Sequence, residues 1–221
     1  MPKPKPARPP RPKPRRSYHH GRLREALIEA AERMIEEEGP ETVTVREAAR
    51  RAGVSPGAPF RHFASRTALM TGVAERAMRR FHDEIARAEA AVDPSDAGAR
   101  YAALGRAYLR WATRHPAQFR VLATRSLIDF DGSESLPSDN DAIRKLMQDI
   151  VADGQKRGQI READPATLEL AAKALSYGLA RMYVDGHFPQ WGVQQREAQA
   201  AMDRVIDLFL ELLRTAAVRR S

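Results

Sequence analysis

The sequence contains no cysteine among its 221 residues. Disulfide bonds, thiolate catalysis and cysteine-based zinc or iron–sulfur sites are therefore excluded. An apolar run of the roughly 20 residues that a membrane helix requires is also missing, because the most apolar stretch, 205–213, contains Asp207 and Glu211. The basic N-terminus leads into polar residues rather than into an apolar signal segment. We expect a cytoplasmic chain that makes no membrane contact.

Patterns of common catalytic and cofactor sites are scarce as well. The six histidines form no His-Glu-x-x-His pair, and no Gly-x-x-x-x-Gly-Lys phosphate loop is present. Residues 53–57 do fit the Gly-x-Ser-x-Gly pattern of a hydrolase nucleophile, but that motif needs a preceding strand and a doubly wound sheet. Helical patterns flank it here instead. We predict no metal, no cofactor and no enzymatic activity, and an all-α enzyme is the alternative from another functional class.

Charge is distributed unevenly along the chain. Lys and Arg total 37 against 29 Asp and Glu, and residues 1–16 hold seven of these cations, seven of the fifteen prolines and no acid. Closely spaced prolines favour an extended, polyproline-like chain over a packed core. We predict that residues 1–16 form a disordered basic tail, which either follows DNA phosphates or only solubilises the protein.

Apolar residues recur at helical spacing through the rest of the chain, which predicts an all-α fold. Pairs such as Gly39-Pro40 and Asp93-Pro94 interrupt the pattern and separate the helices. The predicted helices cover about 23–38, 45–52, 65–92, 101–115, 119–127, 143–151, 165–182 and 193–217, with a short helix between 55 and 63. Residues 129–140, rich in Asp, Ser, Gly and Pro, are predicted to form a loop.

Capping residues define two short helices near the N-terminus. Thr44 and Glu47 form a capping box before the first helix, and Gly53 supplies the positive φ that ends it. Ser55 is the predicted N-cap of the second helix, although Pro59 delays its first regular turn. Two short helices joined by a glycine turn make a helix-turn-helix, which presents a helix to the DNA major groove. An ordinary tight corner between helices uses the same residue types.

Several segments of the N-terminal third agree with one family in residue type and spacing. They are TVREAA at 44–49, AGVS at 52–55, FRHF at 60–63, and Ser65-Arg66 followed by Leu69. Together they resemble the DNA-binding domain of the tetracycline-repressor-like (TetR-type) transcriptional regulators. The resemblance implies a three-helix DNA-binding domain with a helix-turn-helix at 17–66, followed by a larger helical ligand-binding and dimerisation domain at 67–221.

The same resemblance implies a function. We expect a ligand-responsive transcriptional regulator, and more specifically a repressor, that binds a palindromic double-stranded DNA operator as a homodimer. A small apolar effector would release it. A ligand-independent architectural DNA-binding protein remains a second alternative beside the all-α enzyme.

The family likeness also implies which residues contact DNA. Thr44 would contact a phosphate, Arg46 a base or a phosphate, and Arg66 would clamp a phosphate at the start of the next helix. Phe60 stands where the family usually has Tyr, so a phosphate hydrogen bond is missing, while packing against a sugar or a thymine methyl is retained. The complete predicted set is Thr44, Arg46, Ser55, Gly57, Ala58, Phe60, Arg61, His62 and Arg66.

Net charge gives this domain no preference for DNA, because residues 17–66 contain eight cations and eight acids. A positive face would have to arise from sorting of these charges in space. The alternative for Arg46 and Arg61 is that they are only solvated side chains on an exposed surface.

In the larger domain, two groups of apolar residues are predicted to form a ligand pocket and a dimer interface. Aromatic and thioether side chains suit an apolar ligand, and the predicted pocket residues are Tyr108, Trp111, Phe119, Met147 and Tyr177. The last two helices are expected to form the dimer interface through Leu179, Met182, Val205, Phe209 and Leu213. For both groups, burial in the core of a single chain is the alternative.

Overall fold

The structure is a computed structural model, which describes residues 20–214, with side chains from residue 23 onward. The predicted basic tail, residues 1–16, lies outside these residues. The α-helices are α1 (His20–Glu38), α2 (Val45–Arg51), α3 (Arg66–Ala90), α4 (Ala97–Arg114), α5 (Pro116–Ala123), α6 (Leu136–Lys156), α7 (Pro165–Val184) and α8 (Ala198–Leu213). Short 3-10 turns are η1 (Pro40–Thr42), η2 (Pro59–Arg61), η3 (Arg125–Leu127), η4 (Phe188–Trp191) and η5 (Gln195–Glu197). Because residues 20–214 contain no β-strand, the predicted all-α fold is confirmed.

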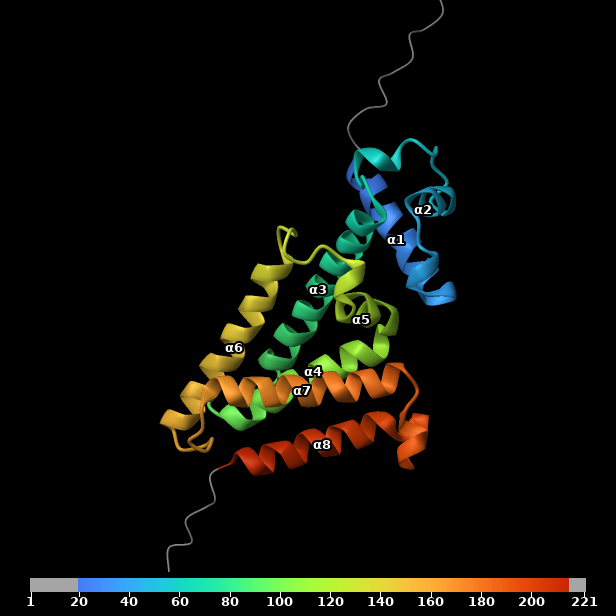
Figure 1. The fold of residues 1–221 in the computed structure, drawn as a ribbon. Coiled ribbons are helices and arrows are strands. Elements are labelled where there is room, and N and C mark those ends of the chain that lie inside the picture. Colours follow the sequence, from blue (N-terminus) through green and yellow to red (C-terminus); the bar gives the residue numbers. More distant parts are fainter. Residues whose placement is uncertain (1–19, 215–221) are drawn as a thin grey trace, which may run out of the picture.

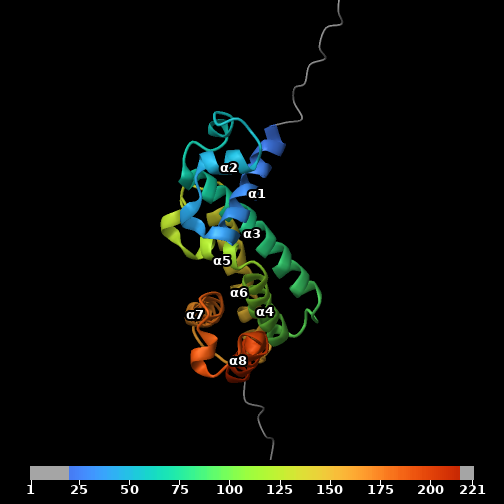
Figure 2. The ribbon, with the colours of Figure 1, turned by 90° about the vertical axis from the view of Figure 1, so that its right-hand side faces the viewer.

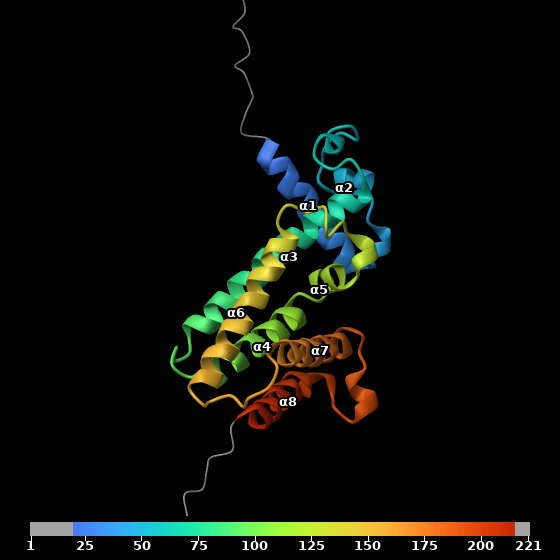
Figure 3. The ribbon, with the colours of Figure 1, turned by 60° about the vertical axis from the view of Figure 1, so that its left-hand side comes forward.

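The helices form an elongated molecule with a small unit at one end (Figure 1). This unit contains α1, α2 and η2, and the long helix α3 runs from it into the larger part of the molecule. Figure 2 shows α7 and α8 at the opposite end from α2. In Figure 3, α6 lies along α3, while α4 passes behind α7 and α8 and packs against both. One continuous helix, α3, therefore connects the small unit to the larger part of the molecule.

Local sequence signals explain where the helices begin. The hydroxyl of Ser65 accepts a hydrogen bond of 3.0 Å from the backbone N–H of Ala68, which caps α3. The carboxylate of Asp164 accepts one of 2.9 Å from the N–H of Thr167, which caps α7 ahead of Pro165. Serine and aspartate are among the residue types favoured at a helix N-cap, and proline suits the first helical turn.

The small unit packs around the first half of α3. Leu27, Ile28, Phe63 and Leu69 are all buried. A Cβ atom on Gly72 would lie 2.9 Å from the ring of Phe63, so α3 approaches this ring more closely than any other residue type would permit. This contact fixes the segment after η2 against α3.

Several predicted boundaries were wrong. Helix α6 begins at Leu136, inside the predicted loop 129–140, because Pro137 is suited to the first turn of a helix. The helix predicted for 119–127 ends at Ala123, and residues after it form η3. The last helix begins at Ala198 rather than at 193, after the separate turn η5.

Candidate DNA-binding surface and ligand cavity

The N-terminus of α2 is capped by Thr44. Its backbone is extended, and its hydroxyl accepts a hydrogen bond of 3.1 Å from the N–H of Glu47, as predicted. The second half of the predicted capping box is not formed. The Glu47 carboxylate accepts hydrogen bonds from Arg50 and Arg51, and the bond from Arg50, opposed in part by desolvation, lowers the Glu47 pKa to about 2.

The turn after α2 follows the predicted geometry at Gly53. Gly53 has a φ of 68°, and the N–H of Val54 donates to the carbonyl of Ala49 at 3.1 Å. This closes the C-terminus of α2 in the manner of a glycine cap. The buried side chain of Ala49 lets the turn lie close to the helix.

The element that follows the turn differs from the expected short helix. The prediction that Ser55 caps it was wrong, because residues 55–58 form a turn in which the N–H of Ala58 donates to the Ser55 carbonyl at 3.0 Å. Between residues 55 and 63 the only helical turn is η2, which begins at Pro59 and receives the N–H groups of His62 and Phe63 on its first carbonyl. Pro56 and Pro59 both lack an N–H, which prevents a longer helix.

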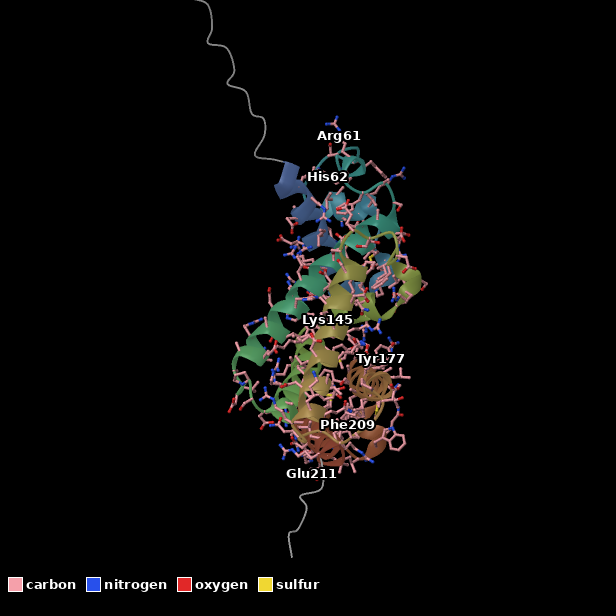
Figure 4. All side chains as sticks on the ribbon, turned by 90° about the vertical axis from the view of Figure 1, so that its left-hand side faces the viewer. Arg61, His62, Lys145, Tyr177, Phe209 and Glu211 are labelled. Carbon is pink, nitrogen blue, oxygen red and sulfur yellow. The ribbon has the colours of Figure 1, made fainter. Side chains whose placement is uncertain are left out.

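Most of the predicted DNA-contacting side chains are exposed at this end of the molecule. Ala58 and His62 are half-buried, and Phe60 is 46% exposed although it is a large apolar residue. Figure 4 shows Arg61 projecting from the tip, with His62 beside it. The exposed members are Thr44, Arg46, Ser55, Gly57, Phe60 and Arg61.

Acidic side chains of the small unit are gathered around one arginine. Arg51 is half-buried and forms ion pairs with Glu37 and Glu38 of α1 and, at 3.3 Å, with Glu47. Glu47 also pairs with Arg50 at 2.6 Å. These contacts neutralise three carboxylates beside α2.

Some cations of the small unit take no part in these ion pairs. Arg46 and Arg61 are exposed, and neither has an ion-pair or hydrogen-bond partner among residues 20–214. Three of the eight acids of 17–66 are thus held in ion pairs with Arg50 and Arg51, and Arg46 and Arg61 are not. The exposed guanidinium groups of Arg46 and Arg61 are therefore available to a phosphate or a base.

Arg66 has a different position from the one expected. Its Nε donates to the carbonyl of Val43 at 2.9 Å, and a terminal nitrogen donates to the carbonyl of Pro40 at 2.7 Å. Arg66 therefore has a structural role, and its contact with a phosphate stays a prediction. Arg66 ties the start of α3 to the segment that precedes α2.

A cavity of about 640 Å³ lies between α3, α4, α5, α6, α7 and α8. All five residues predicted for a ligand pocket line it, namely Tyr108, Trp111, Phe119, Met147 and Tyr177. Its aromatic side chains contact one another, with ring centroids 5.3 Å apart for Phe81 and Tyr108 and 5.9 Å apart for Phe119 and Tyr177. A volume of this size matches the pockets that enclose small organic ligands.

Polar groups in the cavity wall are few. Trp111 is 1% exposed, and its indole Nε1 is buried with no acceptor within the described part of the chain. Burial raises the pKa of Tyr108 well above its usual range. Lys173 lines the same cavity, and its ammonium lies 4.7 Å from the centroid of the Tyr108 ring. Burial of this ammonium lowers its pKa, although the residue as a whole is exposed.

Two sequence profiles match the chain. The profile described as "Bacterial regulatory proteins, tetR family" covers residues 27–73, which contain α2 and the exposed turn η2. A second, described as "Tetracyclin repressor-like, C-terminal domain", covers residues 101–209 around the cavity. The chain belongs to the TetR family of transcriptional regulators. No curated protein matches it significantly.

Solved structures show the same TetR fold. A protein of unknown function from Rhodococcus sp. RHA1 is 30% identical with a TM-score of 0.74, and the match covers 90% of this chain and 98% of that one. A tetR-family regulatory protein from Rhodococcus RHA1 is 20% identical, with a TM-score of 0.68 and coverage of 88% and 98%. The ketosteroid transcriptional regulator KstR2 of Mycobacterium tuberculosis is 19% identical, with a TM-score of 0.63 and coverage of 88% and 96%.

The two parts of this TetR-family chain meet at a buried carboxylate. Glu32 of α1 is 7% exposed, and its Oε1 accepts hydrogen bonds of 3.1 Å from Gln118 of α5 and from Arg80 of α3. Burial raises the pKa of Glu32, and the nearby Arg76 and Arg80 oppose this shift. The neighbour of Gln118, Phe119, lines the cavity, so α5 contacts both the cavity and α1.

The residues predicted for the dimer interface fall into three classes. Leu179 and Leu213 are only 8% and 5% exposed, so they belong to the core of the subunit and are removed from the predicted interface. Phe209, labelled in Figure 4, lines the cavity. Met182 and Val205 are half-buried.

The sequence analysis missed the most exposed apolar residues of α8. Leu208 and Leu212 are 56% and 62% exposed. They are four residues apart and lie on the face opposite to the buried Ile206 and Leu210. The sequence signal for this second, exposed apolar face was the presence of two apolar stripes on one helix.

Neither a membrane span nor a metal cluster is found in the described chain. No helix of residues 20–214 has the length and hydropathy needed to cross a bilayer. The same residues contain no group of three His, Asp or Glu side chains that could hold a metal ion.

Proposed function

We propose that this TetR-family regulator is a ligand-responsive repressor that binds a palindromic DNA operator as a homodimer in the cytoplasm. The observation that carries the proposal is the pairing, along one helix, of two features. The exposed cations Arg46 and Arg61 lie near one end of α3, and an apolar cavity of about 640 Å³ lies beside the rest of it.

The surface around η2 would enter the major groove. Arg61 can bind a guanine through two hydrogen bonds, and Phe60 can pack on a thymine methyl or a sugar. In a two-fold symmetric dimer, two copies of η2 would meet half-sites about 34–36 Å apart, or somewhat more, on one face of the duplex.

The outer faces of α7 and α8 support a dimer. Figures 1 and 3 show the two helices side by side at the end opposite to α2. On α8, Leu208 and Leu212 are exposed, and on α7 the exposed Ala171 and Ala174 offer a flat surface for close helix packing. Solvent-exposed leucines at this spacing suit a self-complementary interface between two copies.

The contact at Glu32 supports communication between the two sites. A ligand that displaced Phe119 would move α5, and with it the hydrogen bond from Gln118 to Glu32 of α1. A change in the tilt of α1 would alter the separation of the two η2 turns in the dimer. Coupling of this kind is typically worth about 1–3 kcal/mol.

Selection of duplex DNA from a random pool by the purified chain tests this function. We expect enrichment of a two-fold symmetric sequence, and weaker binding of that sequence when a cavity ligand is added. DNA binding without sequence preference would favour the architectural alternative and contradict the proposal.

A further inference from the structure

The interior and the mouth of the cavity differ in chemistry. Phe81, Trp111 and Phe119 form a buried aromatic interior. Residues that line the cavity and are also exposed define its mouth, and they include Arg125, Arg144 and Lys173. The site therefore combines an apolar interior with a cationic rim.

The charges that line the cavity are not balanced. Three cations stand against a single acid, Glu169. The Glu169 carboxylate accepts hydrogen bonds of 2.7 Å from Arg144 and from Gln148, so both of its oxygens are engaged by residues other than Lys173 and Arg125. Lys173 and Arg125 have no acidic partner among residues 20–214.

Lys173 is the cation that lies over aromatic rings of the cavity wall on α4 and α7. Its ammonium lies 4.7 Å from the ring centroid of Tyr108 and 6.0 Å from that of Tyr177, and both tyrosines line the cavity. Figure 4 labels Tyr177 on α7, the helix that also carries Lys173. Two aromatic faces partly compensate the ammonium but supply no acceptor for its hydrogen-bond donors.

Loss of hydration around this ammonium destabilises its charged form. It lowers the pKa of Lys173 from its usual value, and desolvation is the sole cause of that shift. A neutral ligand that filled the mouth would remove more water and would destabilise the charged ammonium further. An anionic ligand would instead give the ammonium a charge-assisted partner.

We propose that the cavity binds an amphiphilic carboxylate, whose anionic head pairs with Lys173 at the mouth and whose apolar body lies against Trp111 and Phe119. This names the ligand class for the effector site of the proposed function and rests on that function only for the consequence of binding. The cavity volume of about 640 Å³ is within the usual range for ligands of this size.

The chain provides its own reporter for a binding test. It contains two tryptophans, of which Trp111 lines the cavity and Trp191 is 75% exposed. In a Trp191→Phe background, the fluorescence of Trp111 reports occupancy alone. Titrations with octanoate, dodecanoate and naphthoate would be compared with titrations of dodecanol, the neutral match to dodecanoate.

Three further changes isolate the role of the ammonium. Lys173→Met removes the charge and keeps the apolar length, while Lys173→Arg keeps the charge. Lys145→Met is the matched control, because Lys145 is an exposed lysine of α6 that does not line the cavity (Figure 4).

We expect at least one carboxylate to bind, and Lys173→Met to weaken it by about tenfold to a hundredfold. Lys173→Arg and Lys145→Met should retain most of the affinity, and dodecanol should bind more weakly than dodecanoate and be indifferent to Lys173→Met. Equal carboxylate affinity in Lys173→Met, tighter binding of dodecanol, or no binding of any carboxylate would overturn the proposal. Failure of the proposed function would appear separately, as an absence of an enriched operator in the DNA selection.

Discussion

Arg61 is the residue on which sequence recognition depends most in the proposed function. It is exposed at the tip of the molecule and has no partner among the described residues, so its five N–H donors are available to a base. We expect Arg61→Ala to weaken operator binding by about 1–3 kcal/mol and to relax preference at one base pair per half-site. Fluorescence anisotropy with the selected duplex and its single-base variants measures both effects.

A matched arginine tests whether the effect is local. Arg161 is exposed just after α6, far from η2, so Arg161→Ala should leave operator affinity unchanged. An equal decrease of affinity in the two variants would show that total charge, and not a contact by Arg61, is responsible.

At the residue scale, sequence reasoning succeeded where the partner is near in the chain. Thr44 caps the helix that follows it, as predicted, and accepts a hydrogen bond from an N–H three residues ahead. It did not foresee the intramolecular partners of Arg66, because the carbonyls that bind this side chain are 23 and 26 residues away. Only the folded chain brings those groups together.

Glu32 of α1 links three helices, because its carboxylate accepts hydrogen bonds from Arg80 of α3 and from Gln118 of α5. Burial raises its pKa, so folding favours the protonated form more than the unfolded chain does. The stability that this carboxyl contributes is therefore greatest at low pH and falls as the pH rises above its ordinary value of 4.5.

We expect Glu32→Gln to raise the free energy of unfolding near neutral pH, because the amide imitates the protonated carboxyl. It can also donate to the Oε1 of Gln118, which is buried and unpaired within the described residues. The gain should vanish below the ordinary pKa of the carboxyl. Thermal unfolding over a pH series tests this, with the exposed Glu29→Gln on the same helix as the control. A lower stability of Glu32→Gln at neutral pH would contradict it.

At the element scale, helical spacing was enough for every long helix but not for the segment 55–63. A serine followed by proline is typical of a helix start, and this favoured a cap at Ser55. The second proline, Pro59, restricts the backbone of Ala58 and leaves only the turn η2. The recognition element is therefore shorter than its sequence pattern indicates.

At the scale of the whole molecule, the first prediction concerns the dimer interface. If the faces that carry Leu208 and Leu212 form the dimer, changing both leucines to lysine places like charges across the two-fold axis. We expect the double variant to sediment as a monomer at micromolar concentration, where the unaltered chain sediments as a dimer. Phe60→Lys, at the opposite end, should leave the dimer intact. A dimeric double variant would place the interface elsewhere.

The second prediction at this scale concerns the basic segment 1–16, which contains seven cations. If it follows the duplex, its deletion should reduce the slope of log affinity against log salt, by about 0.9 for each phosphate that the shortened chain no longer neutralises. Operator titrations at several salt concentrations give the slope. An unchanged slope would leave the segment with a solubilising role.

At this scale, composition and periodicity predicted an all-α protein, and the motif at 44–69 predicted its family. The position of the cavity residues also followed from their aromatic character, because large apolar side chains at helical spacing converge between packed helices. The cationic mouth was not foreseen, since Lys173 and Arg125 lie on different elements and single charges on helices carry no spatial signal.

The central claim is that the segment from Ser55 to His62 inserts into the duplex. Phe60 is exposed there, so a photoreactive phenylalanine at position 60 tests it directly. With the selected operator, we predict crosslinks to bases at two symmetric positions, one in the major groove of each half-site. Operator that is fully bound but gives no crosslink from position 60 would contradict the account.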